Sequence, residues 1–134
     1  MNDTGTSKGK ETINGVIPAK SNCYTIAKVN GAARIVKSSE MRRYERNFIK
    51  QCTRYKGIGI NQPFILLVDV YYPDYTHDLD NALKGLLDCL QQVGAITNDK
   101  FCTRIEANRH HDKNRPRVEF EIIVPNEQLK INLQ

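Results

Sequence analysis

Two aspartates separated by one residue, Asp78 and Asp80, stand where a loop passes into a predicted helix. Asp78 precedes the first apolar residue of that helix, so we expect it to be the N-cap that accepts a hydrogen bond from a free amide. Asp80 lies in the first turn, and two carboxylates this close in sequence converge on a small volume. The start of the helix is therefore where we expect the chemistry of this protein.

The same aspartates also have a purely structural interpretation. Aspartate is common at helix starts because it caps the backbone and because its negative charge suits the positive end of the helix dipole. Asp80 and Lys84 form an ordinary exposed i,i+4 pair, worth about 0.2–0.5 kcal/mol. An isolated Asp-x-Asp is structural more often than catalytic, so the rest of the chain has to decide.

The helix that follows has two distinct faces. A charged column of Asp80, Lys84 and Asp88 runs along one face at steps of four. Apolar residues recur at steps of three and four and predict a buried stripe: Leu79, Ala82, Leu83, Leu86, Leu87, Leu90 and Val93. This pattern predicts a helix packed on one side, ending near Gln92 with Gly94 as its C-cap.

Six other segments have the pattern of strands, two of them joined as a hairpin, and one more has the pattern of a helix. Asn30-Gly31 is typical of a type I′ turn and predicts a hairpin, and Pro63–Tyr72 predicts an interior strand. The expected strands are 12–17, 24–29, 32–36, 63–72, 101–108 and 117–124, with a helix from Ser38 or Ser39 to about Tyr55. These elements predict an α+β fold, with one domain in which a mixed four- to five-stranded sheet is packed by two main helices. We expect that domain to span residues 12–125, between a flexible N-terminal tail (1–11) and a C-terminal tail (126–134).

The composition favours an anionic partner and excludes several classes. The 134 residues carry a net charge of +5, with a pI near 9.1. No apolar run approaches the length of a membrane helix, and no secretory signal is recognisable. Four widely spaced cysteines without a CxxC pair argue against a zinc site or a disulfide framework and favour a reducing, cytoplasmic compartment.

The basic residues form two clusters on either side of the paired aspartates. One covers residues 42–56 and the other residues 100–117. An acidic pocket flanked by basic surface is the layout expected where metal ions meet a phosphate backbone, although solvated basic faces are also common. The candidate DNA-binding residues are Arg42, Arg46, Lys50 and Arg54 in the first cluster and Lys100 and Arg104 in the second.

One longer string is more specific than Asp-x-Asp. It reads Asp78-x-Asp80-Asn81-x-x-Lys84-x-x-x-Asp88-x-Leu90, followed by Ile96-x-Asn98-Asp99. This string resembles the RusA family of Holliday junction resolvases, found in bacteria and their prophages. Residues 17–22 are similar to the N-terminal segment of that family, and the resemblance covers roughly residues 13–124.

The resemblance implies a homodimeric, Mg²⁺-dependent endodeoxyribonuclease, with Mn²⁺ as a possible substitute. Such an enzyme resolves four-way DNA junctions by paired symmetric nicks during recombination and repair, in the cytoplasm of a bacterial or phage-infected cell. It needs no membrane and no nucleotide cofactor. The alternatives are a metal nuclease acting on other branched or single-stranded nucleic acid, and a DNA-junction-binding module without catalysis.

The resemblance also implies roles for individual residues. Asp78, Asp80 and Asp99 would be metal ligands and Lys84 a catalytic cation. Asn81 would orient a ligand or water, and Asp88 would be structural. Spacing does not tell whether the chain folds Asp99 back toward the other two aspartates.

His77 and the pair His110-His111 are weaker candidates. A single loop histidine such as His77 is more often an exposed bystander than a base or ligand. We expect His110 and His111, in a charged turn over residues 110–116, to contact solvent or DNA.

Overall fold

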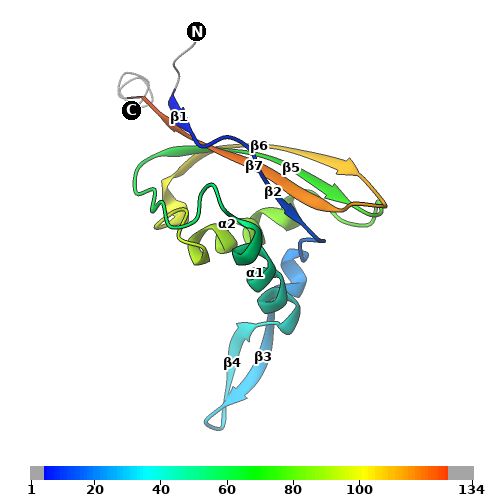
Figure 1. Cartoon of the computed structure of the whole chain (residues 1–134). Coiled ribbons are helices and arrows are strands. Elements are labelled where there is room, and N and C mark those ends of the chain that lie inside the picture. Colours follow the sequence, from blue (N-terminus) through cyan, green and yellow to red (C-terminus); the bar gives the residue numbers. More distant parts are fainter. Residues whose placement is uncertain (1–4, 127–134) are drawn as a thin grey trace.

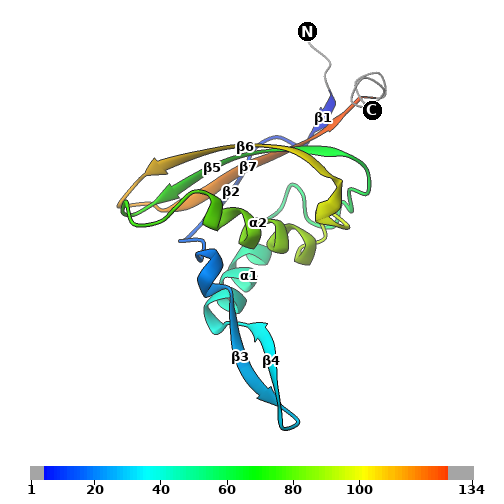
Figure 2. The same cartoon turned by 180° about the vertical axis from the view of Figure 1, so that it is seen from behind.

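The computed structural model describes residues 5–126 as a mixed sheet with two helices on one face and a hairpin that projects away from it (Figures 1 and 2). The α+β prediction is confirmed. The strands and helices are β1 (Gly5–Ser7), β2 (Glu11–Asn14), η1 (Lys20–Asn22), β3 (Tyr24–Val29), β4 (Ala32–Lys37), α1 (Ser39–Gln51), β5 (Phe64–Tyr72), α2 (Asp80–Gln92), η2 (Asp99–Phe101), β6 (Cys102–His111) and β7 (Arg117–Pro125).

The five-stranded sheet has the order β1-β7-β5-β6, and β2 also pairs with β7. Strand β5 is interior, as its apolar sequence predicts: it is antiparallel to β7 and parallel to β6. The parallel pair is joined through α2, which crosses from the end of β5 to the start of β6. As a result, the carboxyl ends of β5 and β6 lie side by side, with Tyr72 opposite His111.

The core lies between the sheet and the two helices. Alternate residues of β5 and β7 point into it, as expected for strands with one covered face. The Phe48 ring of α1 stacks on Phe120 of β7 at a centroid distance of 5.9 Å. The fully buried large side chains are Tyr55, Tyr72, Phe48, Phe64, Phe120, Ile13, Ile17, Met41, Leu66, Leu86, Leu90 and Ile96.

Helix α1 starts as predicted but stops four residues earlier. The Ser38 hydroxyl accepts a hydrogen bond from the Met41 amide (3.0 Å), which confirms the N-cap. The Cys52 amide still donates to the Phe48 carbonyl, but the next two amides, of Thr53 and Arg54, donate to one carboxylate oxygen of Glu11 at 2.9 and 2.6 Å. Glu11 is only 5% exposed, so a buried carboxylate from a distant strand ends the helical hydrogen-bond pattern.

The prediction of a tail over residues 1–11 is wrong for residues 5–11. Gly5–Ser7 forms strand β1, which pairs with β7. Glu11 is the first residue of β2, which also pairs with β7. The polar composition suggested a tail because these side chains offer little to bury, but strand pairing uses the backbone. Residues 1–4 and 127–134, which include most of the predicted C-terminal tail, lie outside the described part of the chain.

The predicted hairpin is present and stands apart from the main sheet. Asn30 and Gly31 have φ angles of 53° and 82°, the left-handed conformation that a type I′ turn requires. Strands β3 and β4 form their own two-stranded sheet, which we call the arm (Tyr24–Lys37), and it extends from the start of α1 away from the body of the protein (Figure 1). No helix between residues 5 and 126 is long and apolar enough to cross a membrane.

Candidate active site

The loop between β5 and α2, residues 73–79, carries the first candidate aspartate and is held by the end of β6. The Arg109 guanidinium donates a hydrogen bond to the His77 carbonyl at 2.9 Å. A ring nitrogen of His111 lies 2.9 Å from the Pro73 carbonyl oxygen. The His77 ring stacks on the buried ring of Tyr72 at 4.5 Å. The loop is therefore fixed at both ends by residues that the parallel pairing of β5 and β6 places beside it.

Asp74 makes a tight turn inside the same loop. Its carboxylate accepts hydrogen bonds from the Thr76 amide (3.0 Å) and hydroxyl (2.7 Å), and it lies 3.0 Å from His77 Nδ1. The hydroxyl and amide of Thr76 and the His77 ring lower the pKa of Asp74 to about 2. The Asp74 carboxylate is thus engaged within the loop, whereas the carboxylate of Asp78, which is also exposed, has no ion pair with a described residue.

Asp78 does not cap α2, so this prediction is wrong. Leu79 occupies the N-cap position with helical angles (φ −61°, ψ −44°), and no side chain caps the helix. The backbone carbonyl of Asp78, rather than its carboxylate, accepts the Asn81 amide at 3.2 Å. Both Asp78 and Asp80 are exposed, and no described residue forms an ion pair with either of them.

Asp78 and Asp80 lie near the same buried hydroxyl. Burial raises the pKa of Tyr72 to about 12, the Arg109 guanidinium opposes that rise, and the two carboxylates add to it. Tyr72 is fully buried, so its ring forms an apolar floor under the loop. Both aspartates therefore act electrostatically on the same buried tyrosine.

Lys84 pairs with Asp88 (3.3 Å) on the exposed side of α2, not with Asp80. Asp88 also accepts a hydrogen bond from the Tyr24 hydroxyl at 2.6 Å, so it joins the base of the arm to α2. This hydrogen bond raises the pKa of Tyr24 to about 12. The contacts of Asp88 agree with the structural role expected for it. Asn81 is half-buried in the first turn of α2.

Asp99 lies at the opposite end of α2 from the paired aspartates. Asp99 begins the short helix η2. Its backbone amide donates to the side chain of Gln91, near the end of α2, at 3.2 Å. Gln91 is eleven residues beyond Asp80, which is about 16 Å along a helix axis. Between residues 5 and 126, no three histidine, cysteine or acidic side chains are placed to hold a metal ion together. A single chain therefore does not bring the three predicted metal ligands into one site.

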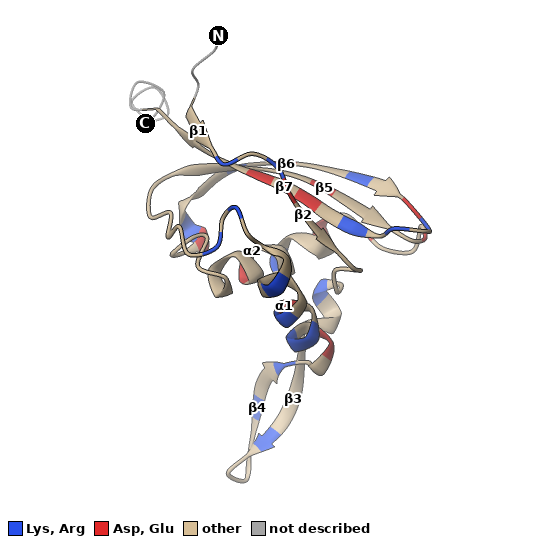
Figure 3. Cartoon of the chain, in the orientation of Figure 1, with Lys and Arg blue, Asp and Glu red and all other residues tan. Residues whose placement is uncertain are grey.

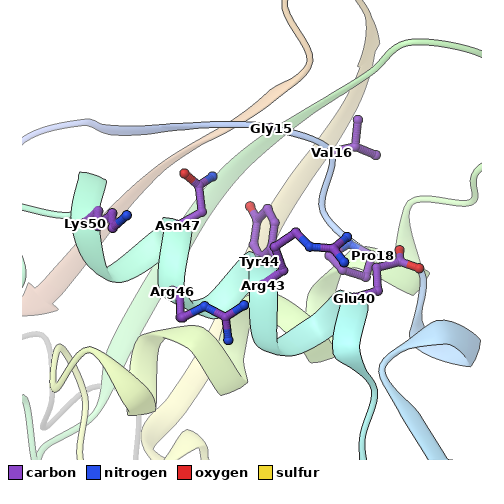
Figure 4. A pocket seen from close by; sticks show the side chains of 9 residues that line it. All are labelled: Gly15, Val16, Pro18, Glu40, Arg43, Tyr44, Arg46, Asn47 and Lys50. Atoms are coloured by element: carbon purple, nitrogen blue, oxygen red, sulfur yellow. The ribbon is translucent and has the colours of Figure 1, made fainter.

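The first basic cluster forms the wall of a groove of about 460 Å³ along α1 (Figure 4). Helix α1 supplies three cations, Arg43, Arg46 and Lys50, together with Glu40, Tyr44 and Asn47, and the segment from Gly15 to Pro18 faces them. Arg42 is exposed on the same helix, and Figure 3 shows the basic residues crowded on α1.

The other predicted DNA-binding residues have local partners. Arg54 lies beyond the end of α1 and donates to the Lys8 carbonyl at 3.3 Å. The Lys100 ammonium lies over the Phe101 ring at 5.3 Å. Arg104 is exposed on β6, where it pairs with Glu106 at 3.1 Å.

Sequence reasoning missed the residues that position the loop. His111 and Arg109 have no motif of their own; their role follows from the parallel register of β6 against β5. His110, expected to face solvent or DNA, instead lies 2.8 Å from an Asp69 carboxylate oxygen and stacks on Tyr71. The turn after β6 also begins at Asp112 rather than at His110, because the strand continues to His111.

Comparison with known proteins identifies the family. The search of curated proteins gives no match to this chain. The family described as endodeoxyribonuclease RusA matches residues 16–123, which include the arm, both helices, the loop with its paired aspartates and nearly all of β7. The chain therefore belongs to the RusA family of endodeoxyribonucleases.

Proposed function

We propose that this protein is a divalent-metal-dependent resolvase that cuts four-way DNA junctions by paired nicks, acting as a homodimer. Membership of an endodeoxyribonuclease family supports the reaction class. The observation that carries the site is the pair of exposed carboxylates, Asp78 in a loop anchored by Arg109 and His111 and Asp80 at the start of α2. Their charges are not neutralised by any ion pair with a described residue.

The donor set suits a hard divalent cation. Mg²⁺ takes oxygen ligands, retains several waters and is commonly held by one or two carboxylates together with substrate phosphate. Asp78 and Asp80 would hold the ion, with Mn²⁺ as a substitute. When bound, the metal supplies Lewis-acid activation of water and stabilises negative charge on the phosphate. Without a cation, clustered carboxylates repel each other and the DNA backbone.

The remaining residues of the site orient the substrate and hold the loop. Lys84 is one helical turn beyond Asp80, about 6 Å along the axis, so its ammonium can neutralise a phosphate oxygen bound beside the aspartates. Asp88 fixes the side chain of Lys84 when DNA is absent. Arg109 and His111 prevent the loop from swinging away, and Asn81 offers an amide to a ligand or water.

Asp99 can join this site only if two chains share it. Because Asp99 lies beyond the far end of α2, a two-fold axis that sets two α2 helices antiparallel would bring Asp99 of the partner subunit toward Asp78 and Asp80. Such a dimer has two equivalent sites related by symmetry, which is what two opposed cuts across a junction need. The dimer thus completes the metal site and also explains paired nicking.

The basic groove of α1 offers a path for the DNA backbone. Exposed arginines and lysines stacked at i,i+4 repel each other, and phosphates relieve that repulsion. Arg42, Arg46 and Lys50 lie on one helix face. We propose that a duplex arm of the junction follows this face toward the catalytic loop.

The experiment that tests the proposal uses a synthetic four-way junction and a linear duplex of matched sequence. Each is incubated with the wild-type protein in Mg²⁺, in Mn²⁺ and in chelator, beside Asp80→Asn. We expect metal-dependent paired nicks on the junction, none on the duplex and none with the variant. Equal cutting of both DNAs would indicate a general metal nuclease. Tight junction binding without cutting in either metal would leave a binding module.

A further inference from the structure

The arm exposes apolar side chains that the protein itself does not cover. Ile26 and Ile35 are 73% and 77% exposed, although they are the largest aliphatic residues of their strands. They lie directly opposite each other in the register of β3 and β4, so they form one apolar patch. A two-stranded hairpin gains little stability alone in water, and exposed paired isoleucines mark a contact surface rather than a core.

The charge of the arm identifies the class of its partner. Residues 24–37 contain three cations, Lys28, Arg34 and Lys37, and no acidic residue. Lys37 pairs with Glu45 of α1 at 2.6 Å, which leaves Lys28 and Arg34 without an ion pair to any residue from 5 to 126. Figure 3 shows basic positions on both strands of the arm and on several turns of α1, and no acidic position on the arm. A partner that meets this surface should be negatively charged.

Alternation along the strands puts the two free cations on opposite faces of the arm. Lys28 shares the face of Ile26 and Ile35, whereas Arg34 pairs with Ala27 on the other face. A ribbon with cations on both faces suits a partner that presents phosphates on both sides. Two duplex arms that diverge from a branch point provide this arrangement, and a single duplex does not.

The base of the arm is fixed to the body near the candidate site. The Ser38 amide donates to the Cys23 carbonyl at 2.9 Å, and the Ser38 hydroxyl donates to the Asn22 carbonyl at 2.6 Å. The Tyr24 hydroxyl bonds to Asp88 of α2, which also holds Lys84. The arm is therefore attached to the helix that begins with Asp80, at a defined orientation.

We infer that the arm enters the branch point of DNA and distinguishes a junction from a duplex, an inference that rests on the proposed function. Lys28 and Arg34 contact phosphates of two diverging duplex arms. The Ile26–Ile35 patch packs against base pairs unstacked at the branch, as apolar wedges do in other DNA-bending proteins. A second copy of the chain fits this surface less well, because two arms that each carry unpaired cations repel each other.

The test compares binding to a four-way junction and to a linear duplex in chelator, which prevents cutting, over a series of salt concentrations. The apolar variant is Ile26→Thr/Ile35→Thr, since threonine keeps the β-branched shape that strands favour. The charge variant is Lys28→Ala/Arg34→Ala. Matched controls are Ile58→Thr, at a residue 37% exposed outside the arm, and Lys8→Ala/Lys20→Ala, at two exposed lysines outside the arm and outside both basic clusters.

We expect the isoleucine variant to lose about tenfold in junction affinity while its duplex affinity stays within about twofold. The charge variant should lower the slope of log affinity against log salt by about 2 on the junction. The controls should change neither quantity, and all variants should keep the wild-type melting temperature.

Three results would overturn the inference. The first is an unchanged ratio of junction to duplex affinity in the isoleucine variant. The second is an unchanged salt slope in the charge variant. The third is a shift of the isoleucine variant from dimer to monomer in sedimentation, which would assign the patch to a second copy of the chain. Absence of cutting by the wild-type protein in Mg²⁺ or Mn²⁺ would refute the proposed function instead, and the binding comparison would still decide the role of the arm.

Discussion

Mixing two inactive variants tests whether two chains share the metal site. Asp80 and Asp99 lie at opposite ends of α2 within one chain. If the site is shared, it takes Asp80 from one subunit and Asp99 from the other. We expect Asp80→Asn and Asp99→Asn each to abolish cutting on its own, and a mixture of the two to recover part of it.

The expected recovery follows from the symmetry of a dimer. When equal amounts of the two variants exchange subunits at random, about half of the dimers contain one chain of each kind. In such a dimer one site carries both substitutions, and the other combines an intact Asp80 with an intact Asp99. About one quarter of all sites are therefore restored, and none of the restored dimers has two working sites.

The assay uses a four-way junction labelled separately on each strand, with subunits exchanged by unfolding and refolding the mixed chains. The mixture should nick at about one quarter of the wild-type rate, one strand per event and without paired cuts. A mixture of Asp78→Asn and Asp80→Asn is the matched control and should stay inactive, because both residues belong to the same half of the site.

Two outcomes would refute the reasoning. Differently tagged chains that co-purify, which proves exchange, but show no nicking would mean that Asp99 does not act with the aspartates of another chain. Full activity of Asp99→Asn alone would remove Asp99 from the site. In either case the argument from the length of α2 would no longer support a shared metal site.

Three further predictions concern the surroundings of the site. Arg109→Ala removes an exposed hydrogen bond to the His77 carbonyl, worth about 1 kcal/mol after solvent screening. Single-turnover cutting should slow about fivefold, and the affinity for the junction should not change. Arg109→Lys should recover part of the rate. Tyr24→Phe removes the hydrogen bond to Asp88 that raises the Tyr24 pKa from 10.0 to about 12. The stability that this hydrogen bond contributes is fully present below pH 10 and is lost as the pH rises through about 12. Ultraviolet titration of the variant should therefore lack one late-ionising tyrosine. Glu11→Ala leaves the amides of Thr53 and Arg54 unpaired beside a buried position. The free energy of unfolding, measured in urea, should fall by about 2–4 kcal/mol. It should fall much less in Glu11→Gln, because glutamine keeps an oxygen acceptor.

Local chemistry made several elements of the fold predictable from the sequence. The hairpin follows from Asn30-Gly31, since few other residue pairs adopt the two left-handed conformations of a type I′ turn. The interior position of β5 follows from a run of apolar residues too long for a strand with an exposed face. Ser38 caps α1 because its hydroxyl lies next to the amides that it serves.

Features that depend on distant contacts were not predictable in the same way. Whether Asp78 caps α2 depends on the backbone angles of the loop, and Arg109 on another strand helps to set them. The early end of α1 depends on Glu11, a carboxylate more than forty residues away in sequence. Strand β1 pairs with a partner near the other end of the chain. No periodicity within a segment contains this information.

The crossover from β5 through α2 to β6 explains why one chain holds only part of the predicted site. In a parallel strand–helix–strand unit, the loop that leaves the first strand lies at the carboxyl edge of the sheet, which is where such folds place their ligand sites. Asp78 lies in this loop, Asp80 begins the helix that follows it, and Arg109 and His111 end the second strand at the same edge. Asp99 lies in the connection that enters β6, at the amino edge, so the length of α2 must separate it from the paired aspartates. No rearrangement of the loops within one subunit closes that separation without unfolding the helix, whereas a second subunit related by a two-fold axis closes it without changing the fold.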